Sequence, residues 1–157
     1  MKQKLYIETS FVSYLTSKPS RDIIIAAHQQ ITGNWWENHS KEFDLYTSQV
    51  VIDEANAGDP EIAKSRLGKL QNIVLLEITD EIINLSQSLM DNKCLPPKSV
   101  EDALHISIAS IHNMNYLLTW NCKHIANAKM RPLIEKVIFE NGFIAPIICT
   151  PEELSGE

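Results

Sequence analysis

The sequence lacks the features that define several large classes of protein. Its three cysteines, Cys94, Cys122 and Cys149, are widely spaced and form no C-x-x-C pair, which argues against a disulfide framework or a cysteine-rich zinc site. The longest apolar runs, such as residues 23–27, are too short to span a bilayer. With only five glycines and 44% hydrophobic residues, the chain is neither fibrous nor disordered. The sequence therefore predicts a cytoplasmic globular protein with reduced thiols and no membrane association.

Several catalytic and nucleotide-binding motifs are missing as well. Neither G-x-x-x-x-G-K-[ST] nor G-x-G-x-x-G occurs, so nothing supports a glycine-rich phosphate-binding loop. There is no G-x-S-x-G, and no cysteine lies in a recognisable nucleophile motif. The net charge of -6 argues against a uniformly basic surface for nucleic acid. It is compatible with an acidic metal pocket beside a local basic patch, as metal-dependent nucleases require.

The pattern of the chain indicates an α/β fold. A length of 157 residues predicts a single domain over residues 1–157. Short β-rich runs alternate with longer helical ones. We expect strands near 4–8, 42–48, 73–78, 116–120 and 146–150, separated by helices near 10–16, 20–36, 49–57, 60–71, 80–92, 99–113 and within 123–141. Strands separated by helices pair in parallel through right-handed crossovers, which predicts a central parallel sheet covered by helices.

Short polar side chains lie where ligands bind in such a sheet, near the carboxyl ends of the strands. They occur in four segments: Glu8 to Ser10, Asp53 and Glu54, Glu101 and Asp102, and Thr119 to Asn121. Carboxylates from different elements repel each other where they converge, unless a cation neutralises them. Ligands that contain only oxygen suit Mg²⁺ or Mn²⁺ better than zinc. The sequence therefore indicates a candidate site for a divalent cation.

Local sequence leaves alternatives open for two of these carboxylates. Ser99 to Asp102 fits the S-x-x-D pattern, so Asp102 is also a candidate partner in a capping box at a helix start. Acidic residues on helices are usually solvated, and Asp53 could serve as well as Glu54. Glu8 is harder to explain structurally, because a carboxylate at the end of a buried strand is rarely buried without a partner.

Four segments in this order resemble the signature segments of PIN-domain proteins: YIETSFVSYL, VVIDEANAGDP, VEDALHISIAS and LLTWNCKHIAN. They are most similar to the VapC-type toxins of toxin–antitoxin pairs, and the resemblance covers residues 4–150. It implies a PIN-like three-layer α/β/α sandwich with a central, mostly parallel sheet of four to five strands. It also implies a metal-dependent endoribonuclease that hydrolyses RNA phosphodiester bonds, the toxin component of a type II pair. RNA, a cognate antitoxin protein and a homodimer are the partners it suggests.

The resemblance assigns roles to individual residues. It places Glu8, Glu54 and Asp102 as ligands of Mg²⁺ or Mn²⁺, and Asn121 at a fourth position that is often aspartate. Ser10 and Thr119 match supporting polar positions. Two departures matter: Glu8 stands where the family usually has aspartate, and Asn121 carries no charge. They motivate an alternative, a catalytically weakened PIN-fold module that binds nucleic acid or a partner; a third hypothesis is a phosphoesterase acting on small molecules.

Other polar and aromatic residues are assigned less specific roles. The basic stretch that follows the fourth predicted strand is a candidate surface for binding RNA: Lys123, His124, Lys129 and Arg131. His105 lies on an apolar helix, where a histidine is more often a hydrogen-bonded core residue than a metal ligand. Trp35 and Trp36 point about 100° apart on a helix, so they cannot form one stacking platform. We expect one of them in the core.

Overall fold

Five parallel strands form the centre of the computed structural model, which describes residues 1–156. The predicted domain extends to Glu157, which lies outside the described residues. The strands lie in the order β3-β2-β1-β4-β5: β1 (Gln3–Ile7), β2 (Phe43–Ser48), β3 (Val74–Leu76), β4 (Tyr116–Leu118) and β5 (Ile147–Cys149). β1 is central and pairs with β2 through Leu5–Leu45 and with β4 through Leu5–Tyr116. The predicted mostly parallel sheet of four to five strands is confirmed.

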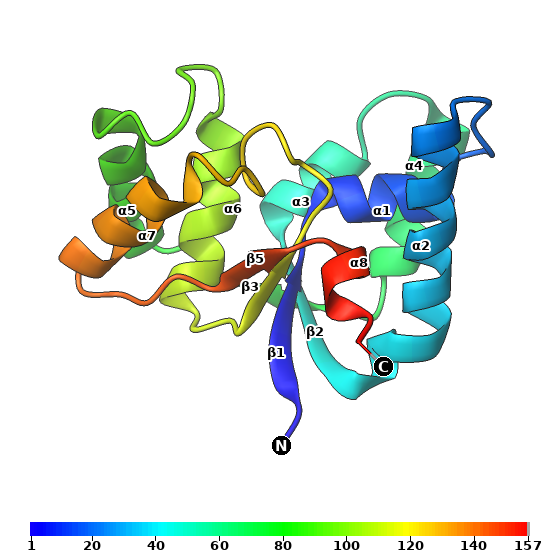
Figure 1. The fold of residues 1–157 in the computed structure, drawn as a ribbon, viewed down its shortest axis with the longest axis horizontal. Coiled ribbons are helices and arrows are strands. Elements are labelled where there is room, and N and C mark those ends of the chain that lie inside the picture. Colours follow the sequence, from blue (N-terminus) through cyan, green and yellow to red (C-terminus); the bar gives the residue numbers. More distant parts are fainter. Residues whose placement is uncertain (157) are drawn as a thin grey trace.

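Helices cover both faces of this sheet, as Figure 1 shows, with α5, α6 and α7 on one side and α1, α2 and α4 on the other. The helices are α1 (Thr9–Thr16), α2 (Ile23–His39), α3 (Gln49–Ala55), α4 (Pro60–Leu70), α5 (Asp80–Asp91), α6 (Val100–Ile111), α7 (Arg131–Glu140) and α8 (Pro151–Leu154). A short 3-10 helix, η1 (Ser40–Glu42), precedes β2. The chain builds the sheet outward from β1 to β3, and then returns to β4 and β5 on the other side. This winding produces the predicted three-layer α/β/α sandwich.

The expected helices and strands are present, with differences at their ends. β1 begins and ends one residue earlier than predicted, and the other four strands are shorter than predicted. α2 begins at Ile23 and continues through Gly33, and Trp35 is the member of the tryptophan pair that lies in the core, at 1% exposure. Residues 123–141 hold only α7, preceded by turns over residues 122–130. The sequence did not predict α8, which begins with a capping box between Thr150 and Glu153.

The central strand is buried on both faces, as expected for a parallel sheet covered by helices. Leu5, Tyr6 and Ile7 have no exposed surface, and Ile106 and Ile108 of α6 pack in the same core. In the described part of the chain, no helix is long and apolar enough to cross a membrane.

The N-terminus of α2 provides a simple stability prediction. Asp22 is the N-cap, and its Oδ1 accepts hydrogen bonds from the backbone N–H groups of Ile24 and Ile25, both at 3.0 Å. Replacing such a cap with alanine typically costs about 1 kcal/mol. We expect Asp22→Ala to lower the free energy of unfolding by about that amount in urea denaturation. Asp44→Ala, at an exposed position of β2, is the control and should leave it unchanged.

Candidate active site

The candidate site lies where the winding of the sheet reverses, between β1 and β4. In open parallel sheets, ligands bind at this point, outside the carboxyl ends of the strands. Glu8 directly follows β1, and its N–H donates to the carbonyl of Leu118, the last residue of β4, at 3.1 Å. Thr119, which follows β4, is fully buried. Backbone pairing therefore places the residues after both strands side by side.

Glu8 is a buried carboxylate held by hydroxyl and backbone donors. Only 4% of it is exposed. Its Oε2 accepts hydrogen bonds from the backbone N–H of Ser10 at 2.9 Å and from Thr119 Oγ1 at 2.8 Å, and Ser10 Oγ donates to the same oxygen. Ser10 Oγ also accepts from the backbone N–H of Trp120 at 2.8 Å. Ser10 and Thr119, predicted as supporting residues, both contact Glu8.

Glu54, rather than its neighbour Asp53, faces this site from α3. Its Oε1 accepts from His105 Nε2 at 2.6 Å and from Thr9 Oγ1 at 2.9 Å. Asp53 is exposed and accepts from Gln49 on its own helix. Burial raises the pKa of Glu54, but the hydrogen bond and charge of His105 and the hydrogen bond from Thr9 outweigh it and hold this pKa below its usual value. Glu54 is therefore ionised at neutral pH.

Asp102 is bound to the segment that follows β4. Its Oδ1 accepts from Asn121 Nδ2 at 3.2 Å, and its Oδ2 lies 3.0 Å from His124 Nδ1. Ser99 is the N-cap of α6 but makes no capping hydrogen bond, because its hydroxyl lies 3.1 Å from His124 Nδ1. The capping box that the S-x-x-D pattern allowed is therefore not formed.

Three carboxylates from different elements affect the pKa of one buried side chain, His105. Burial lowers the pKa of His105, but the hydrogen bond to Glu54 and the charges of Glu8, Glu54 and Asp102 outweigh it and raise this pKa above its usual value. Within residues 1–156, no lysine or arginine forms an ion pair with any of the three carboxylates. Clustered carboxylates are costly unless positive charge offsets their repulsion, and only the histidines that contact Glu54 and Asp102 can supply it among these contacts.

The donor chemistry of this cluster fits a divalent cation. Carboxylate and amide oxygens are the ligands that Mg²⁺ and Mn²⁺ prefer, and such an ion would supply the positive charge that lysine and arginine do not. Among the described residues, however, no three His, Cys, Asp or Glu side chains are arranged to hold a metal ion as they stand. Each carboxylate instead faces hydrogen-bond donors of its own. Joint ligation therefore requires at least some of these side chains to turn toward a common point.

The basic residues predicted to bind RNA differ in their surroundings. Lys123 and Lys129 are exposed. Arg131 begins α7 and donates from Nη1 to the carbonyl of Ile148 at 3.0 Å, which fixes the helix to β5. His124 alone contacts the acidic cluster, through Asp102.

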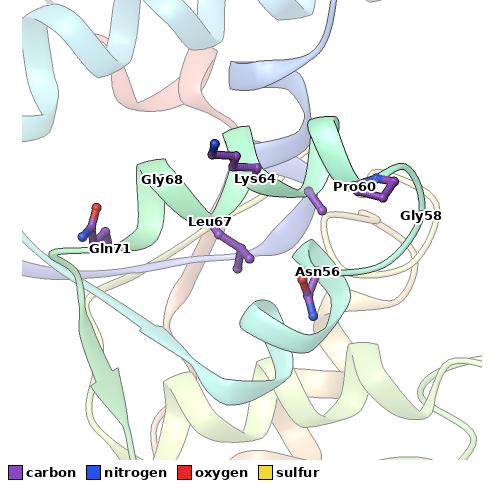
Figure 2. Close-up of a pocket in the computed structure, with 8 residues that line it drawn as sticks. Asn56, Gly58, Pro60, Lys64, Leu67, Gly68 and Gln71 are labelled. Carbon is purple, nitrogen blue, oxygen red and sulfur yellow. The ribbon is translucent and has the colours of Figure 1, made fainter.

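A separate cavity of about 650 Å³ lies along one face of α4, and none of the three carboxylates lines it. Figure 2 shows its lining residues, which come from the end of α3, the following loop and α4. Lys64 is the one charged side chain among them, and no carboxylate takes part. The cavity therefore offers no carboxylate to hold a cation, and the candidate site remains the cluster between β1 and β4.

The ion pair between Glu54 and His105 predicts how stability depends on pH. In the folded protein the pKa of Glu54 is lowered. Its contribution to the free energy of unfolding is therefore complete above about pH 4.5 and is lost as pH falls through the folded pKa. In the folded protein the pKa of His105 is raised. Its contribution to the free energy of unfolding is therefore complete below about pH 6.5 and is lost as pH rises through the folded pKa. Urea denaturation of the metal-free protein should therefore give the largest contribution from this pair between about pH 5 and 6.

Glutamine at position 105 tests this pH dependence, because its amide donates a hydrogen bond without titrating. His105→Gln should lose the decline on the alkaline side and keep the one on the acidic side. An unchanged alkaline decline in His105→Gln would contradict the assignment of that titration to His105.

The comparisons with known proteins identify the fold. The sequence matches no protein-family model and no curated protein. The fold is similar to that of a chain in the crystal structure of VapBC2 from Rickettsia felis bound to a DNA fragment from their promoter, with a TM-score of 0.59 and 16% sequence identity. The match covers 94% of this chain and 98% of that one. The predicted resemblance to VapC-type PIN proteins is therefore confirmed at the level of the fold.

Proposed function

We propose that this protein is a metal-dependent endoribonuclease that hydrolyses RNA phosphodiester bonds, the toxin component of a type II toxin–antitoxin pair. The observation that carries the proposal is the cluster of Glu8, Glu54 and Asp102 at the switch point of the sheet, without a lysine or arginine partner among the described residues. The VapBC2 similarity supports the toxin assignment through the fold.

The side chains have distinct roles in this proposal. Glu8, Glu54 and Asp102 would hold Mg²⁺ or Mn²⁺, and Asn121 orients Asp102 through its amide N–H. A bound divalent cation supplies Lewis-acid charge beside the phosphodiester and lowers the pKa of water. Ser10 and Thr119 hold Glu8 in place.

RNA would contact the protein beside this cluster. His124 uses Nδ1 for Asp102 and Ser99, and its Nε2, which has no hydrogen-bond partner in the described chain, would donate to a phosphate oxygen when both ring nitrogens carry protons. Lys123 is adjacent and exposed, and it would add sequence-independent attraction to the phosphate backbone. A cognate antitoxin and a second copy of the chain are the proposed protein partners.

A cleavage assay tests the proposal directly. A mixed pool of RNA is incubated with the protein and Mg²⁺ or Mn²⁺, with or without EDTA, beside a small aromatic phosphodiester. We expect cleavage of RNA that requires the metal and little hydrolysis of the small ester. Preferred hydrolysis of the small ester would instead support the phosphoesterase hypothesis.

A second function is favoured by one observation: each carboxylate already faces hydrogen-bond donors, and no three acidic or histidine side chains of residues 1–156 are arranged around a common metal position. Under this alternative, the fold is a catalytically weakened module that binds nucleic acid or a partner. It predicts RNA binding of equal strength in EDTA and in Mn²⁺, with no cleavage in either. The nuclease proposal predicts cleavage in Mn²⁺.

A further inference from the structure

A chain of buried polar side chains connects the core of the sheet to Glu54. Ser48 Oγ and His105 Nδ1 each lie 2.8 Å from Tyr6 Oη. At the other end of the ring, His105 Nε2 lies 2.6 Å from Glu54 Oε1. Ser48 and Tyr6 have no exposed surface and His105 is 1% exposed. These groups are therefore shielded from water and depend on one another and on Glu54 for their hydrogen bonds.

The direction of hydrogen bonding toward Glu54 is fixed by its charge. An ionised carboxylate only accepts, so His105 Nε2 carries a proton and donates it to Glu54 Oε1. The other ring nitrogen, Nδ1, is satisfied in either protonation state, because the Tyr6 hydroxyl can donate to it or accept from it, and the Ser48 hydroxyl can reverse in turn. The chain therefore holds the ring in one orientation whatever its charge.

Ser48 contacts Tyr6 in place of the capping hydrogen bond that its position at the start of α3 favours. Ser48 is the N-cap of α3, and serine is among the best residues for capping a helix. Its hydroxyl makes no capping hydrogen bond and instead contacts Tyr6. A local rule of this kind is typically broken near functional sites, and α3 is the helix that carries Glu54.

We infer that Ser48, Tyr6 and His105 form a positioning relay that fixes the rotamer of Glu54 for a divalent cation. Thr9 and His105 both donate hydrogen bonds to Glu54 Oε1. Glu54 Oε2 has no hydrogen-bond partner in the described chain, which leaves this oxygen for the metal. The inference rests on the proposed function, because it assigns these residues a role at the same site. Hydrogen bonds that orient metal ligands typically change metal affinity by about 10- to 100-fold.

Four single substitutions separate the relay from ordinary core packing. Tyr6→Phe removes one hydroxyl, and His105→Leu removes the donor to Glu54. His105→Gln should restore the bond, because its amide can donate to Glu54 and accept from Tyr6. Tyr46→Phe is the matched control: Tyr46 pairs with Tyr6 across β1 and β2, and its hydroxyl has no hydrogen-bond partner in the described chain.

Mn²⁺ affinity, measured by calorimetry, is the first readout. We expect a loss of about tenfold or more in Tyr6→Phe and His105→Leu, near wild-type affinity in His105→Gln, and no change in Tyr46→Phe. If His105→Leu does not fold, Tyr6→Phe carries the test, because it keeps the buried ring.

The second readout needs neither metal nor activity. In NMR spectra of the metal-free protein, the His105 ring N–H should exchange slowly with solvent in the wild type and in Tyr46→Phe, and faster in Tyr6→Phe. If the wild type binds Mn²⁺ and Tyr6→Phe binds it equally well, the relay is overturned and the proposed function stands. If the folded wild type binds no Mn²⁺, both are overturned.

Discussion

Replacing Asp102 with asparagine should reduce metal-dependent RNA cleavage by about 100- to 1000-fold, because it removes a charge that would hold the cation. The substitution keeps the shape of the side chain. Its Oδ1 can still accept from Asn121 Nδ2, so the segment that follows β4 should stay in place. The measurement is the initial rate of cleavage of a labelled RNA in Mg²⁺ and in Mn²⁺.

Glu101→Gln is the matched control for this prediction. Glu101 precedes Asp102 in the first turn of α6, is exposed, and makes no side-chain hydrogen bond within the described chain. The same loss of one negative charge at this position should leave the cleavage rate close to wild type. Equal rates for Asp102→Asn and the wild type, with an unchanged metal requirement, would remove Asp102 from the site.

Mn²⁺ should stabilise the wild-type protein strongly, because it relieves repulsion among three carboxylates that form no ion pair with lysine or arginine in the described chain. A ligand present at about 100 times its Kd adds about 2.7 kcal/mol to the free energy of unfolding. In a domain of this size, that corresponds to a rise in Tm of about 5–10 °C. Thermal unfolding, followed by circular dichroism with Mn²⁺ or with EDTA, measures the shift.

Glu54→Gln and Asp53→Asn form the matched pair for this measurement. The two positions are adjacent on α3, but Glu54 faces His105 and Asp53 is exposed. The Mn²⁺-dependent rise in Tm should be lost in Glu54→Gln and kept in Asp53→Asn. A rise that is the same in both variants would show that Mn²⁺ binds elsewhere.

Much of the fold could be predicted from the sequence because local patterns agree with the global architecture. Short apolar runs separated by helices indicated the parallel sheet, and the rule for strand ends directed attention to Glu8. The region 123–141 was less regular. Pro132 lies in the first turn of α7, and a proline at that position is a known signal for a helix start. That signal places the start of the helix near Arg131.

The contacts inside the candidate site could not be predicted, because they join residues that are far apart in the sequence. His105 was expected to be a hydrogen-bonded core residue, and it is buried. Its partner Glu54, 51 positions away, is chosen by packing of α6 against α3. The choice of Glu54 over Asp53 likewise depends on the direction in which α3 faces. At Ser99, the local capping pattern was overridden by a contact with His124 from another segment.

Calorimetric titration of Mn²⁺ into the metal-free wild-type protein tests the central claim most directly, because it asks whether Glu8, Glu54 and Asp102 form one cation site. The account predicts saturable binding that Mg²⁺ competes for and that is lost in Asp102→Asn, with Glu101→Gln unchanged. A folded wild-type protein that binds no Mn²⁺, or one whose binding is unaffected by Asp102→Asn, would contradict it.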